Sequence, residues 1–247
     1  MLILKHGKTE TISKLPSNLI IDLEQGAEFV ECTKLDVIDI IRKNKSNPLV
    51  VIQELGKKLD NYYNEHGKYP YDYLTVDTTS ALEEFARKYA TIMYKATPIG
   101  KSFAGTDVVS ELPSGGGYDW LRKAFDELLK PIENRCNKCF ILVSHVKNSS
   151  INKQGKDLQA KDIQLTGKLK SIVCAEADAI GYIYRNPQNA NQTMLSFKTH
   201  EQDLATGARP DHLANQEFVI LELENPDYIT RKEPRRFKNN WNQIFLD

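Results

Sequence analysis

The sequence has no excess of charge of either sign, because its 247 residues contain 33 Lys and Arg against 33 Asp and Glu. A chain without net charge exerts no long-range attraction on a polyanion or an anionic membrane, so only a local patch would bind either. Long apolar runs are also missing, and stretches such as Phe140–Val143 are far shorter than the ~20 residues that cross a bilayer. We therefore expect no membrane-spanning helix.

The sequence shows no signs of export and contains little cysteine. Its first residues have no basic segment followed by an apolar segment and a small-residue cleavage site, so we expect a cytoplasmic protein. The four cysteines, Cys32, Cys136, Cys139 and Cys174, are then expected to be reduced thiols. Cys136 and Cys139 have C-x-x-C spacing, but a four-ligand zinc site needs a second pair, and none is evident.

The composition itself is that of a globular protein, with 40% hydrophobic residues to supply a core. Short β-like runs alternate with amphipathic helices, a pattern that predicts an α/β fold with a mainly parallel central sheet flanked by helices. The first four runs are expected to be buried central strands, and the last three an antiparallel C-terminal extension. The runs are Leu2–Leu4, Asn18–Asp22, Tyr73–Asp77, Phe140–Ser144, Ala179–Tyr184, Thr193–Lys198 and Phe218–Leu223.

Helical spacing of apolar residues predicts helices over residues 35–41, 48–59, 80–94 and 120–132. Three segments break the pattern and are expected to be long loops: residues 97–117, residues 147–161 and the tail after Pro226. The predicted organisation is one domain over residues 1–225, followed by a basic and aromatic tail over residues 226–247.

The first run leads into Gly7-Lys8-Thr9 and a short predicted helix, Glu10–Leu15. Between a strand and a helix, Gly-Lys-Thr is the end of a phosphate-binding loop, in which Lys reaches the β- and γ-phosphates and Thr binds Mg²⁺. The complete G-x-x-x-x-G-K-[ST] pattern requires Gly where this chain has Leu2, so the loop is about three residues short. Such a loop offers fewer N–H groups to the β-phosphate, which predicts weak ATP binding or none.

Polar residues follow three other buried runs. Asp22 and Glu24 come after the second run, where a carboxylate polarises an attacking water or holds a metal; the alternative is a helix cap or a surface turn. Asp77 ends the third run in the form of a Walker B strand, whose Asp binds Mg²⁺. Ser144 and His145 end the fourth, where polar groups sense the γ-phosphate, although a single His at a strand end is also commonly structural. Ligands of open α/β sheets bind at the carboxyl ends of parallel strands, so the four clusters predict one site.

The order of these motifs resembles the RecA-like P-loop ATPases, and most closely the AAA-domain nucleotide-binding proteins of phages related to single-strand annealing and RecA-type recombination. The segments that carry the likeness are residues 7–9, 19–26, 74–82, 141–146 and 204–215. The resemblance implies a RecA-like P-loop core, ATP and Mg²⁺ as ligands, and assembly as a ring or filament. It also implies a role in recombination or replication in a bacterial or phage-infected cell, with a single-stranded-DNA-binding protein as a further partner.

The resemblance also implies roles for individual residues. Arg209 is a candidate finger acting in cis or across a subunit interface, and its alternative is a solvated loop charge. The other implied roles are phosphate binding by Gly7, Lys8 and Ser144, Mg²⁺ binding by Thr9, Asp77 and Asp22, catalysis by Glu24 and γ-phosphate sensing by His145.

A basic segment follows the sensor strand directly, at the position where RecA-like proteins contact single-stranded DNA with a mobile loop. The tail mixes cations with aromatic rings such as Trp241, which suits phosphate neutralisation and base stacking. The alternatives are a solubilising loop and a tail packed by its aromatic residues. The candidate DNA-binding residues are Lys147, Lys153, Lys156, Lys161, Arg235 and Arg236.

Two functions are therefore expected from the sequence. The first is an ATPase that acts on single-stranded DNA. The second is a P-loop-fold scaffold or interaction protein that does not hydrolyse ATP, because its phosphate loop is short.

Overall fold

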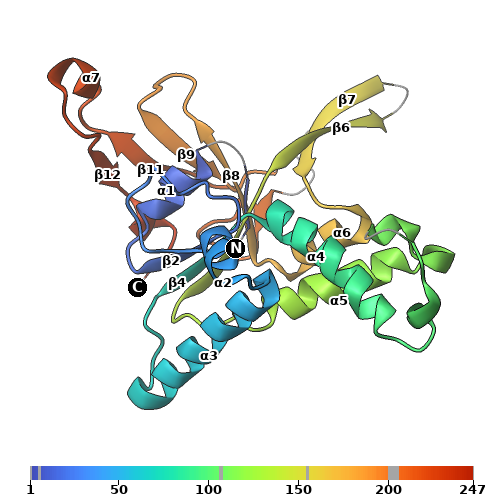
Figure 1. The fold of residues 1–247 in the computed structure, drawn as a ribbon. Coiled ribbons are helices and arrows are strands. Elements are labelled where there is room, and N and C mark those ends of the chain that lie inside the picture. Colours follow the sequence, from blue (N-terminus) through green and yellow to red (C-terminus); the bar gives the residue numbers. More distant parts are fainter. Residues whose placement is uncertain (1, 5–6, 106–107, 154–155, 200–205, 247) are drawn as a thin grey trace.

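The computed structural model describes residues 2–4, 7–105, 108–153, 156–199 and 206–246, which form two sheets and the helices packed on them (Figure 1). The seven predicted strands are confirmed, with ends shifted by no more than two residues. The strands are β1 (Leu2–Leu4), β2 (Asn18–Asp22), β3 (Lys34–Asp36), β4 (Tyr73–Asp77), β5 (Cys139–Ser144), β6 (Val146–Lys153), β7 (Lys156–Ile163), β8 (Ala179–Arg185), β9 (Gln192–Ser196), β10 (Gly207–Ala208), β11 (Glu217–Leu223) and β12 (Phe237–Asn239).

The helices begin and end where local chemistry requires it. Asn47 caps the longest one, α3, by accepting a hydrogen bond from the Val50 amide, Pro48 occupies its first turn, and Gly67 ends it with a positive φ. The α-helices are α1 (Lys8–Ser13), α2 (Val37–Asn44), α3 (Pro48–His66), α4 (Thr79–Lys95), α5 (Gly117–Leu129), α6 (Gly167–Glu176) and α7 (Tyr228–Arg231). No helix within the described residues is long and apolar enough to cross a membrane.

The main sheet has the order β12-β11-β9-β8-β1-β5-β4-β2-β3, with β10 paired to β8. The six strands from β8 to β3 run parallel, whereas β9, β11 and β12 continue the sheet as antiparallel strands. The predicted parallel core is therefore confirmed, as is the antiparallel extension for β9 and β11. The run Ala179–Tyr184 was assigned to that extension wrongly, because β8 pairs parallel with β1 and joins the core. β1 lies in the middle of the sheet, so its carboxyl end lies between the carboxyl ends of β8 and β5.

Alternate residues of the strands pack into two hydrophobic clusters, one on each face of the main sheet. The first cluster joins the sheet to α2, α3, α4, α5 and α6. The second joins it to α1 through Ile12 and to the end of the chain through Trp241 and Ile244. One face is thus covered by five helices, and the other by α1 and the C-terminal residues.

The expected loop over residues 147–161 is wrong, because β6 and β7 pair antiparallel along their whole length as a separate two-stranded sheet. Figure 1 shows this hairpin extending away from the body of the molecule. The base of the hairpin is closed by one further backbone bond, in which the Gln164 amide donates to the His145 carbonyl at 2.9 Å. The predicted loop over residues 97–117 contains three short 3₁₀ helices, at Gly100–Ser102, Val109–Glu111 and Pro113–Gly115.

The segment expected as a tail is packed against the rest of the fold. β12 adds to the edge of the main sheet, and the Trp241 side chain is only 2% exposed. The prediction that Trp241 offers a ring for base stacking is therefore wrong, and the alternative of a segment packed by its aromatic residues is the one observed.

Candidate nucleotide-binding site

The predicted polar clusters meet at one edge of the sheet. In the parallel register, Leu4 lies opposite Ser144, Asp77 opposite Val143 and Asp22 opposite Asp77. The carboxyl ends of β1, β2, β4 and β5 are therefore level with one another. Residues 5 and 6 of the phosphate loop lie outside the described residues, and the site is described from Gly7 onward.

Lys8 is the first residue of α1 and is buried, with 6% of its surface exposed. Gly7 precedes it with φ 80°, a conformation that glycine adopts without steric cost. The Lys8 Nζ donates to the Ser144 carbonyl at 3.3 Å and lies 3.0 Å from His145 Nδ1. Burial lowers the pKa of Lys8, while the carboxylates of Asp77 and Glu24 act in the opposite direction.

Thr9 and Asp77 form the second part of the site. The Thr9 hydroxyl donates to Asp77 Oδ2 at 2.6 Å, and Asp77 is 3% exposed. Burial raises the pKa of Asp77, opposed by the Thr9 hydrogen bond and by the charge of Lys8. The second carboxylate oxygen, Oδ1, is buried and accepts no hydrogen bond within the described part of the chain.

These oxygens fit Mg²⁺, which prefers carboxylate, hydroxyl, phosphate and water ligands. No cluster of three or more His, Cys, Asp or Glu among the described residues could hold a metal alone. Asp77 and Thr9 would thus supply only part of the coordination shell, as in sites where nucleotide phosphates and water supply the rest. The same finding gives no support to a metal site at Cys136 and Cys139.

Glu24 lies between two partners on neighbouring strands. The Thr78 hydroxyl donates to Glu24 Oε1 at 2.5 Å, and His145 Nε2 lies 3.2 Å from Oε2. Because the ammonium of Lys8 can only donate, His145 Nδ1 accepts a hydrogen bond from it and the Nε2–H donates to Glu24. Lys8, His145, Glu24 and Thr78 therefore form one continuous hydrogen-bonded chain.

Thr78 was not among the residues predicted from the sequence. Its hydroxyl also accepts a hydrogen bond from the Ala81 amide and so caps α4. The sequence feature that could have identified Thr78 is its position directly after Asp77, at the end of a buried strand. A hydroxyl at that position can cap the following helix and also reach the candidate site.

Asp22 has a different environment from the one expected of a metal ligand. Its Oδ1 accepts from the amides of Glu24 and Gly26 at 3.1 Å each, and its Oδ2 accepts from the Ala27 amide at 2.9 Å. The carboxylate is 1% exposed. These bonds shape the turn that carries Glu24, and we assign Asp22 to that role in place of metal binding.

Replacing Asp22 with Asn is expected to destabilise the protein by about 1–3 kcal/mol, since one buried amide loses its acceptor and faces an NH₂ group. Urea denaturation followed by circular dichroism measures this change. Asp39→Asn is the control, because Asp39 is half-exposed and pairs with Lys43 on the surface of α2. An Asp22→Asn variant as stable as the control would contradict the assignment.

The structure does not bring Arg209 to this edge. Its guanidinium donates to Asp178 Oδ1 at 2.9 Å and to the Ala175 carbonyl at 2.6 Å. Asp178 precedes β8, which runs parallel to β1, so Arg209 lies at the opposite edge of the sheet from Lys8. This geometry speaks against a finger acting in cis.

The other predicted residues also have defined places. Ser144 offers its carbonyl to Lys8, while its hydroxyl donates to the His145 carbonyl. Lys147 at the base of the hairpin donates to the Leu165 carbonyl at 3.5 Å. Arg235 pairs with Glu10 and Arg236 with Glu233. Lys153, Lys156 and Lys161 lie on the hairpin strands.

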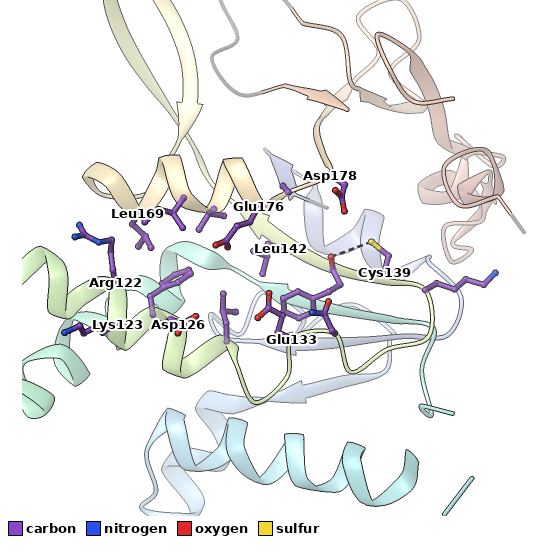
Figure 2. Close-up of a pocket in the computed structure, with 17 residues that line it drawn as sticks. Arg122, Lys123, Asp126, Glu133, Cys139, Leu142, Leu169, Glu176 and Asp178 are labelled. Atoms are coloured by element: carbon purple, nitrogen blue, oxygen red, sulfur yellow. Dashed lines mark hydrogen bonds between the residues drawn. The ribbon is translucent and has the colours of Figure 1, made fainter. Parts of the chain in front are cut away.

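One cavity lies beside the candidate site at the carboxyl ends of the parallel strands, and another lies away from it. A cavity of about 510 Å³ is lined by Glu24 and His145 together with Ser80, Glu84 and Gln164, and so adjoins the predicted site. Another of about 510 Å³ lies between α5, α6 and β5, where Figure 2 shows Cys139, Leu142 and Glu176 among its lining residues. None of the predicted site residues lines this second cavity.

A family model described as an AAA domain matches residues 5–207. The chain belongs to this AAA-domain family. The matched range contains the whole candidate site, from Gly7 to His145, and membership of the family supports nucleotide binding by the chain. No curated protein sequence matches the chain. The last 40 residues, from Ala208 onward, lie beyond the part that defines this AAA-domain family.

Proposed function

We propose that the protein binds ATP with Mg²⁺ at this sheet edge and hydrolyses it. The observation that carries the proposal is Asp77 Oδ1 beside Thr9, which is buried and has no hydrogen-bond partner among the described residues, with Lys8 and Glu24 as charged neighbours of Asp77. A buried carboxylate oxygen without a partner costs free energy, and a ligand ion with its waters would remove that cost. Membership of the AAA-domain family supports the same assignment.

The residues have separate roles in this proposal. Lys8 binds the β- and γ-phosphates, Thr9 and Asp77 hold Mg²⁺, and Glu24 orients the attacking water. Mg²⁺, when bound, neutralises charge that develops on the phosphate oxygens. Binding of phosphate by Lys8 would free His145 Nδ1, so that His145 distinguishes the ATP-bound from the nucleotide-free site.

The experiment that tests this proposal measures Mg²⁺-dependent phosphate release together with an ATP-dependent rise in melting temperature. Both are expected for an ATPase. A thermal shift without phosphate release would favour the second candidate, a P-loop-fold scaffold that does not hydrolyse ATP, which the short phosphate loop supports. The absence of both phosphate release and a thermal shift would overturn the proposal that the protein binds ATP.

We further propose that single-stranded DNA is the macromolecular ligand and that the β6–β7 hairpin contacts it, in an oligomer of ring or filament form in the cytoplasm. Two observations support this. The hairpin begins at Val146, directly after His145, and extends from the body of the molecule (Figure 1). Lys153 and Lys156 lie opposite each other in its register, nearest its far end. A single-stranded-DNA-binding protein is then a further partner.

Replacing Lys153, Lys156 and Lys161 with Glu is expected to weaken oligonucleotide binding by at least about tenfold and to reduce its salt dependence. Each lost phosphate contact lowers the slope of log K against log salt by about 0.7 for single strands. Fluorescence anisotropy at several salt concentrations measures both effects. The control replaces Lys57, Lys58 and Lys68, which are exposed on and after α3, and changes the net charge equally. Equal binding by the two triple variants would remove the hairpin from the proposal.

A further inference from the structure

Residues near the C-terminus contact the short helix that carries Lys8. Arg235 forms an ion pair with Glu10 at 2.6 Å, and the Trp241 indole Nε1–H donates to the Thr11 carbonyl at 3.3 Å. The Asn239 side-chain amide donates to the Lys14 carbonyl. We call Arg235, Asn239 and Trp241 the C-terminal clamp. Figure 1 shows α1, in blue, beside the C-terminal strands β11 and β12.

One path from the clamp to the described end of the phosphate loop runs through Thr11. Thr11, which accepts the hydrogen bond of Trp241, donates its amide to the Gly7 carbonyl at 3.0 Å and its hydroxyl to the same oxygen at 2.7 Å. Trp241 and Thr11 are each 2% exposed. A displacement of the clamp would therefore act on Gly7 through one buried residue.

Helix α1 needs such outside support. It contains six residues, and Gly7 supplies no side-chain cap to its first turn. Isolated helices of this length are unstable in water, because too few hydrogen bonds offset the cost of nucleation. Two carbonyls near its carboxyl end accept side-chain donors of the clamp. The Thr11 carbonyl accepts from Trp241 in addition to the Lys14 amide, and the Lys14 carbonyl accepts from Asn239.

We propose that Arg235, Asn239 and Trp241 are positioning residues that hold α1 so that Lys8 and Thr9 face the nucleotide. The inference rests on the proposed ATP binding and adds a part of the chain outside the AAA-domain match, which ends at residue 207. It also gives Arg235 a partner within the fold, in contrast to the DNA contact expected from the sequence.

Arg235→Glu and Arg236→Glu form a matched pair for testing the clamp. Both side chains are exposed cations one residue apart, and Arg236 pairs with Glu233 of its own segment. Arg235→Glu places a like charge beside Glu10 and is expected to raise the KM and the Kd for ATP about threefold to tenfold, with kcat little changed. Arg236→Glu is expected to leave all three at the wild-type values. The double variant Glu10→Arg with Arg235→Glu restores this ion pair but places a cation beside Arg185, which lies 3.9 Å from Glu10 Oε2, and is expected to recover the affinity in part.

A second variant and a nucleotide-free measurement separate the clamp from the proposed activity. Trp241→Phe keeps a buried ring but removes the Nε1–H donor. Hydrogen exchange at the Thr11 amide is expected to be faster in Arg235→Glu and Trp241→Phe than in Arg236→Glu, with no ATP present. Unchanged exchange in both variants would overturn the clamp, even where ATP binds. Faster exchange in a protein that binds no ATP would retain the clamp and overturn only the proposed function.

Discussion

Glu24→Gln is expected to lower the rate of ATP hydrolysis by at least about 100-fold while ATP still binds. A positioned general base contributes about 10²–10⁴ to a rate, and an amide cannot accept the proton of the attacking water. Glutamine retains the shape of Glu24, and its Oε1 can accept the hydrogen bonds of both Thr78 and His145. The hydrogen-bonded chain is thus preserved, and the lost charge accounts for the effect.

The control for this experiment is Glu84→Gln. Glu84 lines the same cavity as Glu24, but its side chain is 70% exposed and pairs only at 3.4 Å with Arg87. Steady-state phosphate release and the ATP-dependent thermal shift are measured on both variants. If Glu24→Gln hydrolysed ATP as fast as Glu84→Gln, Glu24 would not orient the water, and the carboxylate of the site would have to be sought elsewhere.

The central sheet could be predicted from the sequence because its strands are short, nearly continuous apolar runs. Such runs are typical of strands covered on both faces, and β2 and β4 are buried at every position. Their parallel order then placed Asp22, Asp77 and His145 at one edge without knowledge of any side-chain contact. The fold and the location of the candidate site therefore follow from local patterns.

The hairpin was missed because its sequence lacks that signal. Residues 147–153 contain one apolar side chain, Ile151, and the two strands pair with each other rather than with the main sheet. Residues 147–153 therefore show no alternation of apolar and polar residues that would reveal a strand. Its composition resembles a loop, although its backbone hydrogen bonds form a ladder.

Contacts between distant residues account for the remaining differences. Trp241 is buried against Thr11, 230 residues away, and Arg209 is bonded to Asp178 at the opposite edge from Lys8. Nothing in the neighbouring sequence of either residue distinguishes a packed side chain from a solvated one. Charge and aromatic content showed that these residues could bind a ligand, but only the fold determines what they contact.

Lys8→Met is expected to abolish ATP binding, with a loss of at least about 100-fold in affinity, because the contact between a buried ammonium and the phosphates is removed. The apo protein is expected to be no less stable than the wild type. Burial lowers the pKa of Lys8 despite the nearby Asp77 and Glu24, so desolvation outweighs their attraction and the charged form is disfavoured in the folded state. Methionine retains most of the buried stem.

The stability of the apo protein and its affinity for ATP are both expected to change with pH through the titration of Lys8. The unfolded chain binds the Lys8 proton more tightly than the folded chain, so this cost to apo stability diminishes as pH rises from the lowered pKa of Lys8 toward its ordinary value of 10.5. ATP affinity is expected to fall over the same range, since neutral Lys8 attracts phosphate weakly.

Calorimetric titration and thermal unfolding of Lys8→Met are compared with those of Lys138→Ala. Lys138 is an exposed lysine just before β5, at the opposite end of the parallel strands from Lys8. A Lys8→Met variant that binds ATP as tightly as Lys138→Ala would show that the nucleotide does not occupy this site. Loss of ATP binding together with a higher melting temperature would identify Lys8 as a residue that binds the ligand at a cost to the stability of the fold.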